Sequence, residues 1–353
     1  MTIVFAILLF SLLIFVHELG HFVAAKLSNV QVNEFSMFMG PAIFKKQVGE
    51  TLYSLRCIPI GGYCAMEGED TDTDNPRSFQ KAAWWKRLII LAAGAFMNFL
   101  AGLLIFGVLY LPMNQTVDPV ITQFQDCCQF NHETGLQLGD RIMELDGEKI
   151  YMNSDISMLL SMNSTYEHDV VVLRDGERLV FENLKMAHIH VDENGQEYLH
   201  YGFGFGQARE ADFWDRLENV WNVTIDNVRI VRLSLQMLLT GQASVAEVSG
   251  PVGIVQMMSD VAASSDGALN AFLNMLSFGG MIAVNLAVMN LLPIPALDGG
   301  RILGLLLTTG IEAVTKKKLN PKFEGYIHGV GMILLLGLMA LILFKDIFAI
   351  FKG

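Results

Sequence analysis

The chain has 353 residues, of which 52% are hydrophobic and only 17% charged, and its formal net charge is −12. That apolar fraction exceeds what is usual for a soluble domain and is typical of a polytopic membrane protein that carries a soluble part. The negative charge argues against nucleic acid as a partner, since nucleic-acid binding requires a basic surface.

Residues 1–27 are predicted to form the first transmembrane helix. Residues 2–16 carry no charge, no basic residue precedes them and no small-residue cleavage site follows, so a signal peptide is not favoured. The run ends in His17-Glu18-Leu19-Gly20-His21. Residues four apart share a helix face, so the two imidazoles can bind one metal ion while Glu18 accepts a proton from water.

Ionisable groups within a membrane-spanning helix are costly and mark a functional site. The alternative is that His17 and His21 are two structural histidines, each hydrogen-bonded inside the bundle. It is disfavoured because an unpaired imidazole or carboxylate in hydrocarbon costs free energy. The first prediction is therefore a metal-dependent hydrolase that works inside the membrane.

Residues 28–87 are predicted to form a cytoplasmic loop. Within it, residues 52–66 have the composition of a β-hairpin that turns at Gly61 and Gly62. An exposed strand edge here could pair with an unwound substrate, although a short structural sheet is the alternative. Residues 88–111 are uncharged and glycine-rich, contain Asn98, and form the predicted second span.

Residues 112–207 predict a small β-rich domain. The run from Gly135 to Ile142, followed by Asp146-Gly147, resembles the core signature of a PDZ domain, and a second turn is expected at Asp175-Gly176. PDZ domains add a peptide strand to a sheet edge, so a peptide C-terminus is an expected partner. A steric filter that excludes large ectodomains fits the same sequence.

Residues 208–274 are predicted to form linker helices. Apolar side chains recur at helical spacing from Phe213 to Leu239, and Trp214 and Trp221 suit a membrane interface. We expect an amphipathic helix on the membrane surface, with packing against the β-rich domain as the alternative.

Residues 275–300 form the predicted third span, which descends toward the same side of the membrane as the histidine pair. Pro293 and Pro295 interrupt the helix before Asp298. Irregular backbone at membrane depth is tolerated where it is buried or lines a cavity. Two histidines, one carboxylate and a water form an open catalytic zinc site, so Asp298 is the expected third ligand. A capping carboxylate beside Arg301 is the alternative.

Residues 301–326 are predicted as a second cytoplasmic loop and residues 327–348 as the fourth span. Lys and Arg near span ends concentrate between spans one and two and between spans three and four, which indicates that both loops are cytoplasmic. Both termini and the β-rich domain are then extracytoplasmic. The expected fold is a polytopic α-helical membrane protein with four transmembrane helices and an inserted extracytoplasmic PDZ-like β-rich domain.

The chain closely resembles the site-2 protease family of intramembrane metalloproteases, in its bacterial sigma-factor-regulating branch. The resemblance rests on the H-E-L-G-H run at His17 and on N-x-x-P-x-P-x-L-D-G, which begins at Asn290. Shorter matches are Gly61-Gly62-Tyr63, Gly94-x-x-x-Asn98-Phe99 and the run 249–254.

The resemblance implies an endopeptidase of the bacterial inner membrane that uses Zn²⁺ to cut single-span membrane proteins within or near the lipid bilayer. Anti-sigma factors and remnant signal peptides are substrate classes at the level of the family. The implied zinc ligands are His17, His21 and Asp298, with Glu18 as general base. The residues implied near substrate are Asn98, Asn290, Pro293, Gly61 and Gly62.

Two other functional classes are open: a membrane scaffold or carrier that holds zinc without hydrolysis, and a PDZ adaptor with a vestigial site. Glu18 favours the enzyme, because a carrier needs no base at that position.

Overall fold

The computed structural model describes residues 2–69, 73–125, 135–163, 165–191, 197–242, 250–316, 329–334, 336–337, 339–342 and 344–345. The chain divides into two compact units. Residues 1–106 and 227–353 form one, called the membrane unit below, and residues 107–226 form the other, called the β-rich unit.

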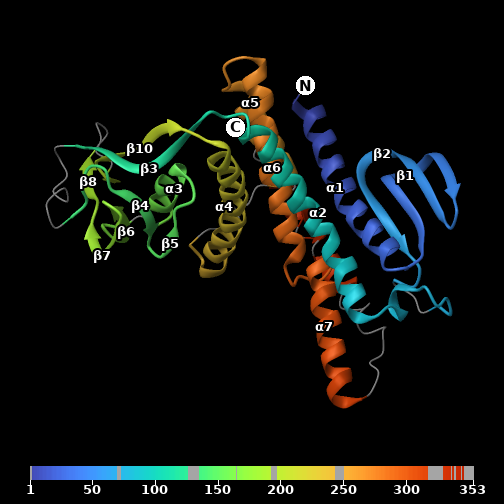
Figure 1. The fold of residues 1–353 in the computed structure, drawn as a ribbon. Helices are drawn as coiled ribbons and strands as arrows, with labels where there is room; N and C mark the ends of the chain where they lie inside the picture. Colours follow the sequence, from blue (N-terminus) through green and yellow to red (C-terminus); the bar gives the residue numbers. More distant parts are fainter. Residues whose placement is uncertain are drawn as a thin grey trace. The chain divides into compact units, whose positions relative to one another are not determined.

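Three helices in the described part of the chain are long and apolar enough to cross a membrane: α1 (Thr2–Leu27), α2 (Trp84–Tyr110) and α6 (Ala268–Leu291) (Figure 1). They correspond to the first three predicted spans. The predicted fourth span, 327–348, lies partly outside the described residues, which include only a shorter apolar helical stretch within 329–342.

The third span ends earlier than the sequence predicts. Helix α6 stops at Leu291, and a separate helix, α7 (Asp298–Thr315), begins at the residue expected to close that span. Residues 301–315 of the predicted cytoplasmic segment 301–326 are therefore helical, and the position of that segment in the cytoplasm stays a prediction. The physical reason is that Pro293 and Pro295 end α6, and the chain after them is free to start a new helix.

The three long helices pack closely where glycines face a neighbour. A Cβ built on Gly20 of α1 would lie 2.3 Å from the carbonyl oxygen of Ala93 in α2. A Cβ on Gly279 of α6 would lie 3.0 Å from the Leu9 side chain of α1, and Gly102 of α2 is similarly close to α6. Lipid provides no hydrophobic drive for helices to associate, so close backbone approach at small residues supplies the packing.

A β-sheet in the membrane unit joins α1 to α2 along the chain. It consists of β1 (Val32–Val48) and β2 (Thr51–Met66), which pair antiparallel around a turn at Gly49 and Glu50. Residues 34–37 of β1 have Cα partners both in residues 52–55 and in residues 62–65 of β2. The two halves of β2 therefore flank residues 34–37 of β1.

The predicted hairpin turn at Gly61 and Gly62 is wrong. Both glycines are buried within β2, and Gly62 is the Cα partner of Met37 in β1. The sequence pattern reveals a break in strand composition at the two glycines, but pairing with the earlier strand overrides the local turn preference. The sheet is attached to the membrane helix by the Ser11 hydroxyl, which donates to the Pro59 carbonyl at 2.7 Å.

The β-rich unit is built on one antiparallel sheet with strand order β10-β3-β4-β6-β7 and β5 paired to β4. Its elements are β3 (Gln115–Phe124), β4 (Arg141–Leu145), β5 (Glu148–Lys149), α3 (Asn153–Met162), β6 (Glu167–Arg174), β7 (Glu177–Lys185) and β10 (Phe203–Glu210). A separate hairpin of β8 (His188–Val191) and β9 (Glu197–His200) precedes β10. Two further helices follow in the chain, α4 (Phe213–Thr240) and α5 (Pro251–Ala263).

The two predicted tight turns of the β-rich unit are confirmed. Asp146-Gly147 connects β4 to β5 and Asp175-Gly176 connects β6 to β7, with positive φ at all four residues. Positive φ at both central positions is the requirement of a type I′ hairpin turn, which explains the Asp-Gly dipeptides.

Candidate active site

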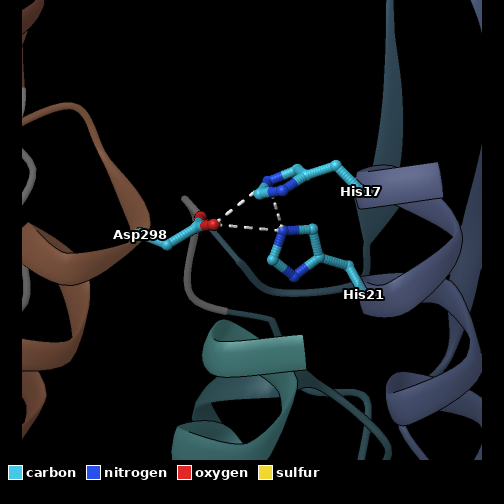
Figure 2. A group of neighbouring side chains, drawn as sticks. All are labelled: His17, His21 and Asp298. Carbon is cyan, nitrogen blue, oxygen red and sulfur yellow. Dashed lines mark hydrogen bonds and ion pairs between the residues drawn. The ribbon is translucent and has the colours of Figure 1, made fainter. Parts of the chain in front are cut away.

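Two imidazoles and one carboxylate converge in the membrane unit (Figure 2). His17 and His21 project from α1, and Asp298 is the first residue of α7. The two Nε2 atoms are 3.1 Å apart, and Asp298 Oδ2 lies 3.1 Å from His17 Nε2 and 3.4 Å from His21 Nε2. The structure thus brings together side chains from distant parts of the sequence, since Asp298 follows His17 by 281 positions.

This triangle has the dimensions of a zinc site. Ligand atoms ~2.0–2.1 Å from a tetrahedral Zn²⁺ lie about 3.3 Å from one another. The observed spacings of 3.1 to 3.4 Å match that value. Asp298 Oδ2 is also buried without a hydrogen-bond donor in the described part of the chain, a state that a cation would relieve. The residues therefore fit a metal ion.

The hydrogen bond made by His21 Nδ1 determines which nitrogen of the ring carries the proton. His21 Nδ1 lies 2.8 Å from the Ile90 carbonyl oxygen of α2, which can only accept. The proton is therefore on Nδ1, and the lone pair of Nε2 points to the carboxylate and to His17. A ring nitrogen held in this way is the usual support of a metal-binding histidine.

Asn98 provides the corresponding contact for His17. Its amide group lies against His17 Nδ1 at 3.4 Å, and its Oδ1 atom has no partner among the described residues. Amide oxygen and nitrogen are assigned from the hydrogen-bond network. With the amide rotated by 180°, Oδ1 accepts from Nδ1–H, and Nε2 is free to bind metal. Asn98 thus contacts His17, and its predicted role near substrate stays a prediction.

Gly94 makes room for the two imidazoles. A Cβ built on Gly94 would lie 2.4 Å from His21 Nε2 and 2.6 Å from His17 Cε1. No larger residue fits beside both rings. Gly94 lies in the Gly94-x-x-x-Asn98 motif, from which no role was predicted for it; its spacing of four from Asn98 was the available signal, because it places both residues on one face of α2.

Glu18 lies next to the β-sheet. A Cβ built on Gly62 would lie 3.6 Å from Glu18 Cγ, so β2 passes directly beside this carboxylate. Gly61 has φ +79° and packs against the Met39 side chain. Gly62 therefore lies beside the carboxylate that follows His17, and the predicted role of both glycines near substrate stays a prediction.

Asp298 is held by a tight connection between α6 and α7. A Cβ on Gly299 would lie 2.2 Å from the Leu292 carbonyl oxygen, and one on Gly300 would lie 2.3 Å from that of Ile294. Two glycines directly after Asp298 thus let the first turn of α7 pack on the preceding chain. The carboxylate also occupies a helix N-terminus, where negative charge is favoured.

Asn290 and Pro293 belong to the same connection. Asn290 is half-buried near the end of α6, and Pro293 is exposed in the turn that follows. The structure records no hydrogen bond between either residue and the three converging side chains. Their predicted role near substrate stays a prediction.

Comparison with known proteins gives one consistent result. The family model described as Peptidase family M50 matches residues 5–338. A Clostridium perfringens protein named as a zinc metalloprotease is 34% identical over 348 residues, which cover 98% of each chain. One from Fusobacterium nucleatum with the same description is 35% identical over 364 residues, covering both chains completely. The regulator of sigma-W protease RasP of Bacillus subtilis is 28% identical over 441 residues and 99% of each chain.

Proposed function

The chain belongs to peptidase family M50 and is a zinc metalloprotease, and from that premise we propose that His17, His21 and Asp298 hold the Zn²⁺ and that Glu18 is the general base. The observation that carries the proposal is the convergence of three ligand atoms, 3.1 to 3.4 Å apart, two from α1, a helix of membrane-spanning composition, and one from the first residue of α7. Three protein ligands leave one position of a tetrahedral zinc ion open for reaction.

The reaction is hydrolysis of a peptide bond. When bound, Zn²⁺ acts as a Lewis acid that polarises the scissile carbonyl and acidifies the attacking water. Glu18 accepts a proton from that water as the water oxygen bonds to the carbonyl carbon. It then delivers the proton to the amide nitrogen as the carbon–nitrogen bond breaks. Ile90 and Asn98 keep the histidine rings in the tautomer that binds metal.

The substrates we propose are single-span membrane proteins, including anti-sigma factors and remnant signal peptides. A helical substrate hides its peptide bonds, so it must be presented in extended form. The closeness of Gly62 to Glu18 supports binding of an extended substrate along β2. The similarity to RasP, which is named as a sigma-W regulator, supports the same substrate class.

The membrane arrangement we propose has four spans in the bacterial inner membrane, the fourth being residues 327–348. The basic residues between spans one and two, and those after α6, support cytoplasmic positions for both segments. Both termini and the β-rich unit are then extracytoplasmic. Helix α4 lies on the membrane surface in this arrangement, which its exposed Phe213, Trp214 and Trp221 support.

A peptide C-terminus is the second partner we propose, bound by the β-rich unit as in a PDZ domain. A cavity of about 610 Å³ lies between α3 and the end of the sheet formed by β10. Ser157 and Leu160 line it from α3, and Phe203 and Phe205 line it from β10. Because β10 is the last strand of the sheet, a peptide can add to its free edge.

The carrier and adaptor alternatives are not favoured. Relatives that match over almost the full chain are named as zinc metalloproteases, and the carboxylate that hydrolysis needs is present at Glu18.

The proposal is tested by zinc content and cleavage of a single-span substrate in detergent. We expect Glu18→Gln to retain zinc and to lose cleavage, and Asp298→Ala to lose zinc. Asp266→Asn, which changes an exposed carboxylate of the same unit, is the matched control and should do neither. Cleavage by Glu18→Gln at the wild-type rate would overturn the assignment of the base. Full zinc affinity in Asp298→Ala would overturn the ligand set.

A further inference from the structure

One face of α7 carries both a proposed metal ligand and a set of anchoring contacts. Asp298, Arg301, Ile302 and Leu305 follow the i, i+3, i+4, i+7 spacing that places side chains on one helix face. Leu305 is buried in the hydrophobic cluster formed by α1, α2, β1 and β2, and Ile302 packs against that cluster. The first turn of α7 is therefore attached to the part of the unit that carries the histidines.

Arg301 makes a polar contact within this face. Its guanidinium forms an ion pair with Glu69, which follows β2 by three residues. The Arg301 side chain is 32% exposed and that of Glu69 only 17%, so the pair is partly shielded from water. The second oxygen of Glu69 accepts from the Met66 backbone N–H at 3.4 Å, which ties the carboxylate to the end of β2.

The Glu69–Arg301 ion pair links α7 to the sheet that packs on α1, and these two helices supply the proposed ligands. Two of the proposed ligands belong to α1, and the sheet packs on α1 through the Ser11–Pro59 hydrogen bond and the shared hydrophobic cluster. The third ligand belongs to α7, which is separated from the sheet by most of the sequence. Arg301 lies one helical turn from Asp298, so a tether at Arg301 restricts the position of the carboxylate.

We propose that the Glu69–Arg301 ion pair is a positioning contact that holds the start of α7 so that Asp298 completes the metal site. The inference rests on the proposed ligand set and adds to it two residues that bind neither metal nor substrate. A carboxylate displaced by about 1 Å would lose its place in a tetrahedral site, because zinc–oxygen distances vary by only about 0.2 Å.

The direction in which each substitution changes zinc affinity distinguishes a positioning contact (a tether) from a direct effect of the two charges on the cation. If the two charges act on the cation only through their fields, removal of the negative Glu69 weakens zinc binding and removal of the positive Arg301 strengthens it. If the pair is a tether, removal of either partner weakens zinc binding. Removal of both then costs no more than removal of one, because the interaction is already lost.

The experiment measures zinc affinity by chelator competition in purified Glu69→Gln, Arg301→Gln and the double variant, in detergent. We expect each single variant to bind zinc about 10–100-fold more weakly, as for other residues that support metal ligands, and the double variant to match them. Arg301→Lys, which keeps the charge, should recover most of the affinity. Glu34→Gln breaks the similarly exposed Glu34–Arg56 pair of the same sheet and should leave affinity unchanged.

Wild-type affinity in both single variants, or tighter binding in Arg301→Gln, would overturn the inference. Asp298→Ala serves as the reference for the site itself. If it too binds zinc at wild-type affinity, the proposed ligand set is wrong; if it loses zinc while Glu69→Gln does not, only the positioning contact is wrong. Should Arg301→Gln fail to give a monodisperse protein, Glu69→Gln and Arg301→Lys still decide the question.

Discussion

At the residue scale, helix α2 supports the proposed metal site without supplying a ligand. Gly94 leaves space for both imidazoles, and Asn98, one turn further along, contacts the outer nitrogen of His17. Ile90, one turn earlier, accepts from His21 through its carbonyl oxygen. The spacing of four residues places all three groups on the same face of α2, so the helix acts as a single support for the histidine pair.

Replacement of Gly94 by alanine should remove zinc from the purified protein. The added Cβ would overlap His21 Nε2 at 2.4 Å, so at least one ring must leave its position. Gly107→Ala on the same helix is the matched control, because its Cβ would meet nothing closer than 3.9 Å and alanine favours a helix. Zinc content by atomic absorption checks the pair; equal zinc in both variants would contradict the role assigned to Gly94.

Asn98→Ala should weaken zinc binding about 10–100-fold, the usual effect of removing the outer partner of a metal-binding histidine. Asn98→Asp keeps an acceptor for His17 Nδ1–H and should bind zinc at least as tightly as wild type. Chelator competition measures both. If alanine and aspartate behave alike, the hydrogen bond to His17 is not what Asn98 contributes.

At the element scale, the turn between β1 and β2 is fixed by charge. Glu50 accepts from Arg77 at 2.5 and 2.9 Å and from Lys26, at the end of α1, at 2.7 Å. These hydrogen bonds, from Arg77 first and Lys26 second, lower the pKa of Glu50 from 4.5 to about 2. The turn thereby connects the sheet to α1 and to the segment that leads into α2.

The low pKa of Glu50 predicts a pH-dependent contribution to stability. Because the pKa is lower in the folded state, the contribution is complete above the ordinary value of 4.5 and is lost as the pH falls toward about 2. At pH 7 the free energy of unfolding of wild type should exceed that of Glu50→Gln by about 1 kcal/mol or less, because water screens the charges of a partly exposed ion pair. Wild type should therefore have the higher Tm. The difference in Tm should shrink between pH 4.5 and pH 2. A difference that stays constant over this range would contradict the assignment.

At the scale of the whole molecule, the two units divide the work. All three proposed ligands, Glu18 and the supporting residues of α2 belong to the membrane unit. The β-rich unit has its own sheet and its own cavity. The proposed metal site and the proposed peptide site therefore use residues of different units.

Removal of residues 115–210, which form the sheet of the β-rich unit, should leave zinc binding intact. The Ala211 N–H donates to the Asn114 carbonyl at 2.9 Å, so the two ends of the segment 115–210 lie side by side and a short glycine–serine linker can replace it. We expect the shortened protein to bind zinc with wild-type affinity. A monodisperse shortened protein without zinc would show that the membrane unit depends on the β-rich unit.

Patterns within single segments determined the outline of this protein. The His17–His21 spacing, the uncharged spans and the Asp-Gly turns depend on neighbours within one helix or hairpin, and periodicity reveals those directly. The sequence also singled out Asp298 as an expected ligand, because two prolines and a carboxylate in an apolar segment are unusual enough to indicate a site.

Tertiary structure decided what depends on how distant segments meet. The pairing of Gly62 with Met37, the space beside Gly94 and the Glu69–Arg301 contact all arise from strands and helices far apart in the chain. A one-residue change in strand pairing or a small rotation of a crossing helix would bring other side chains together with no change in local pattern. The sequence therefore determined which chemistry this chain carries, and packing decided which residues hold it in place.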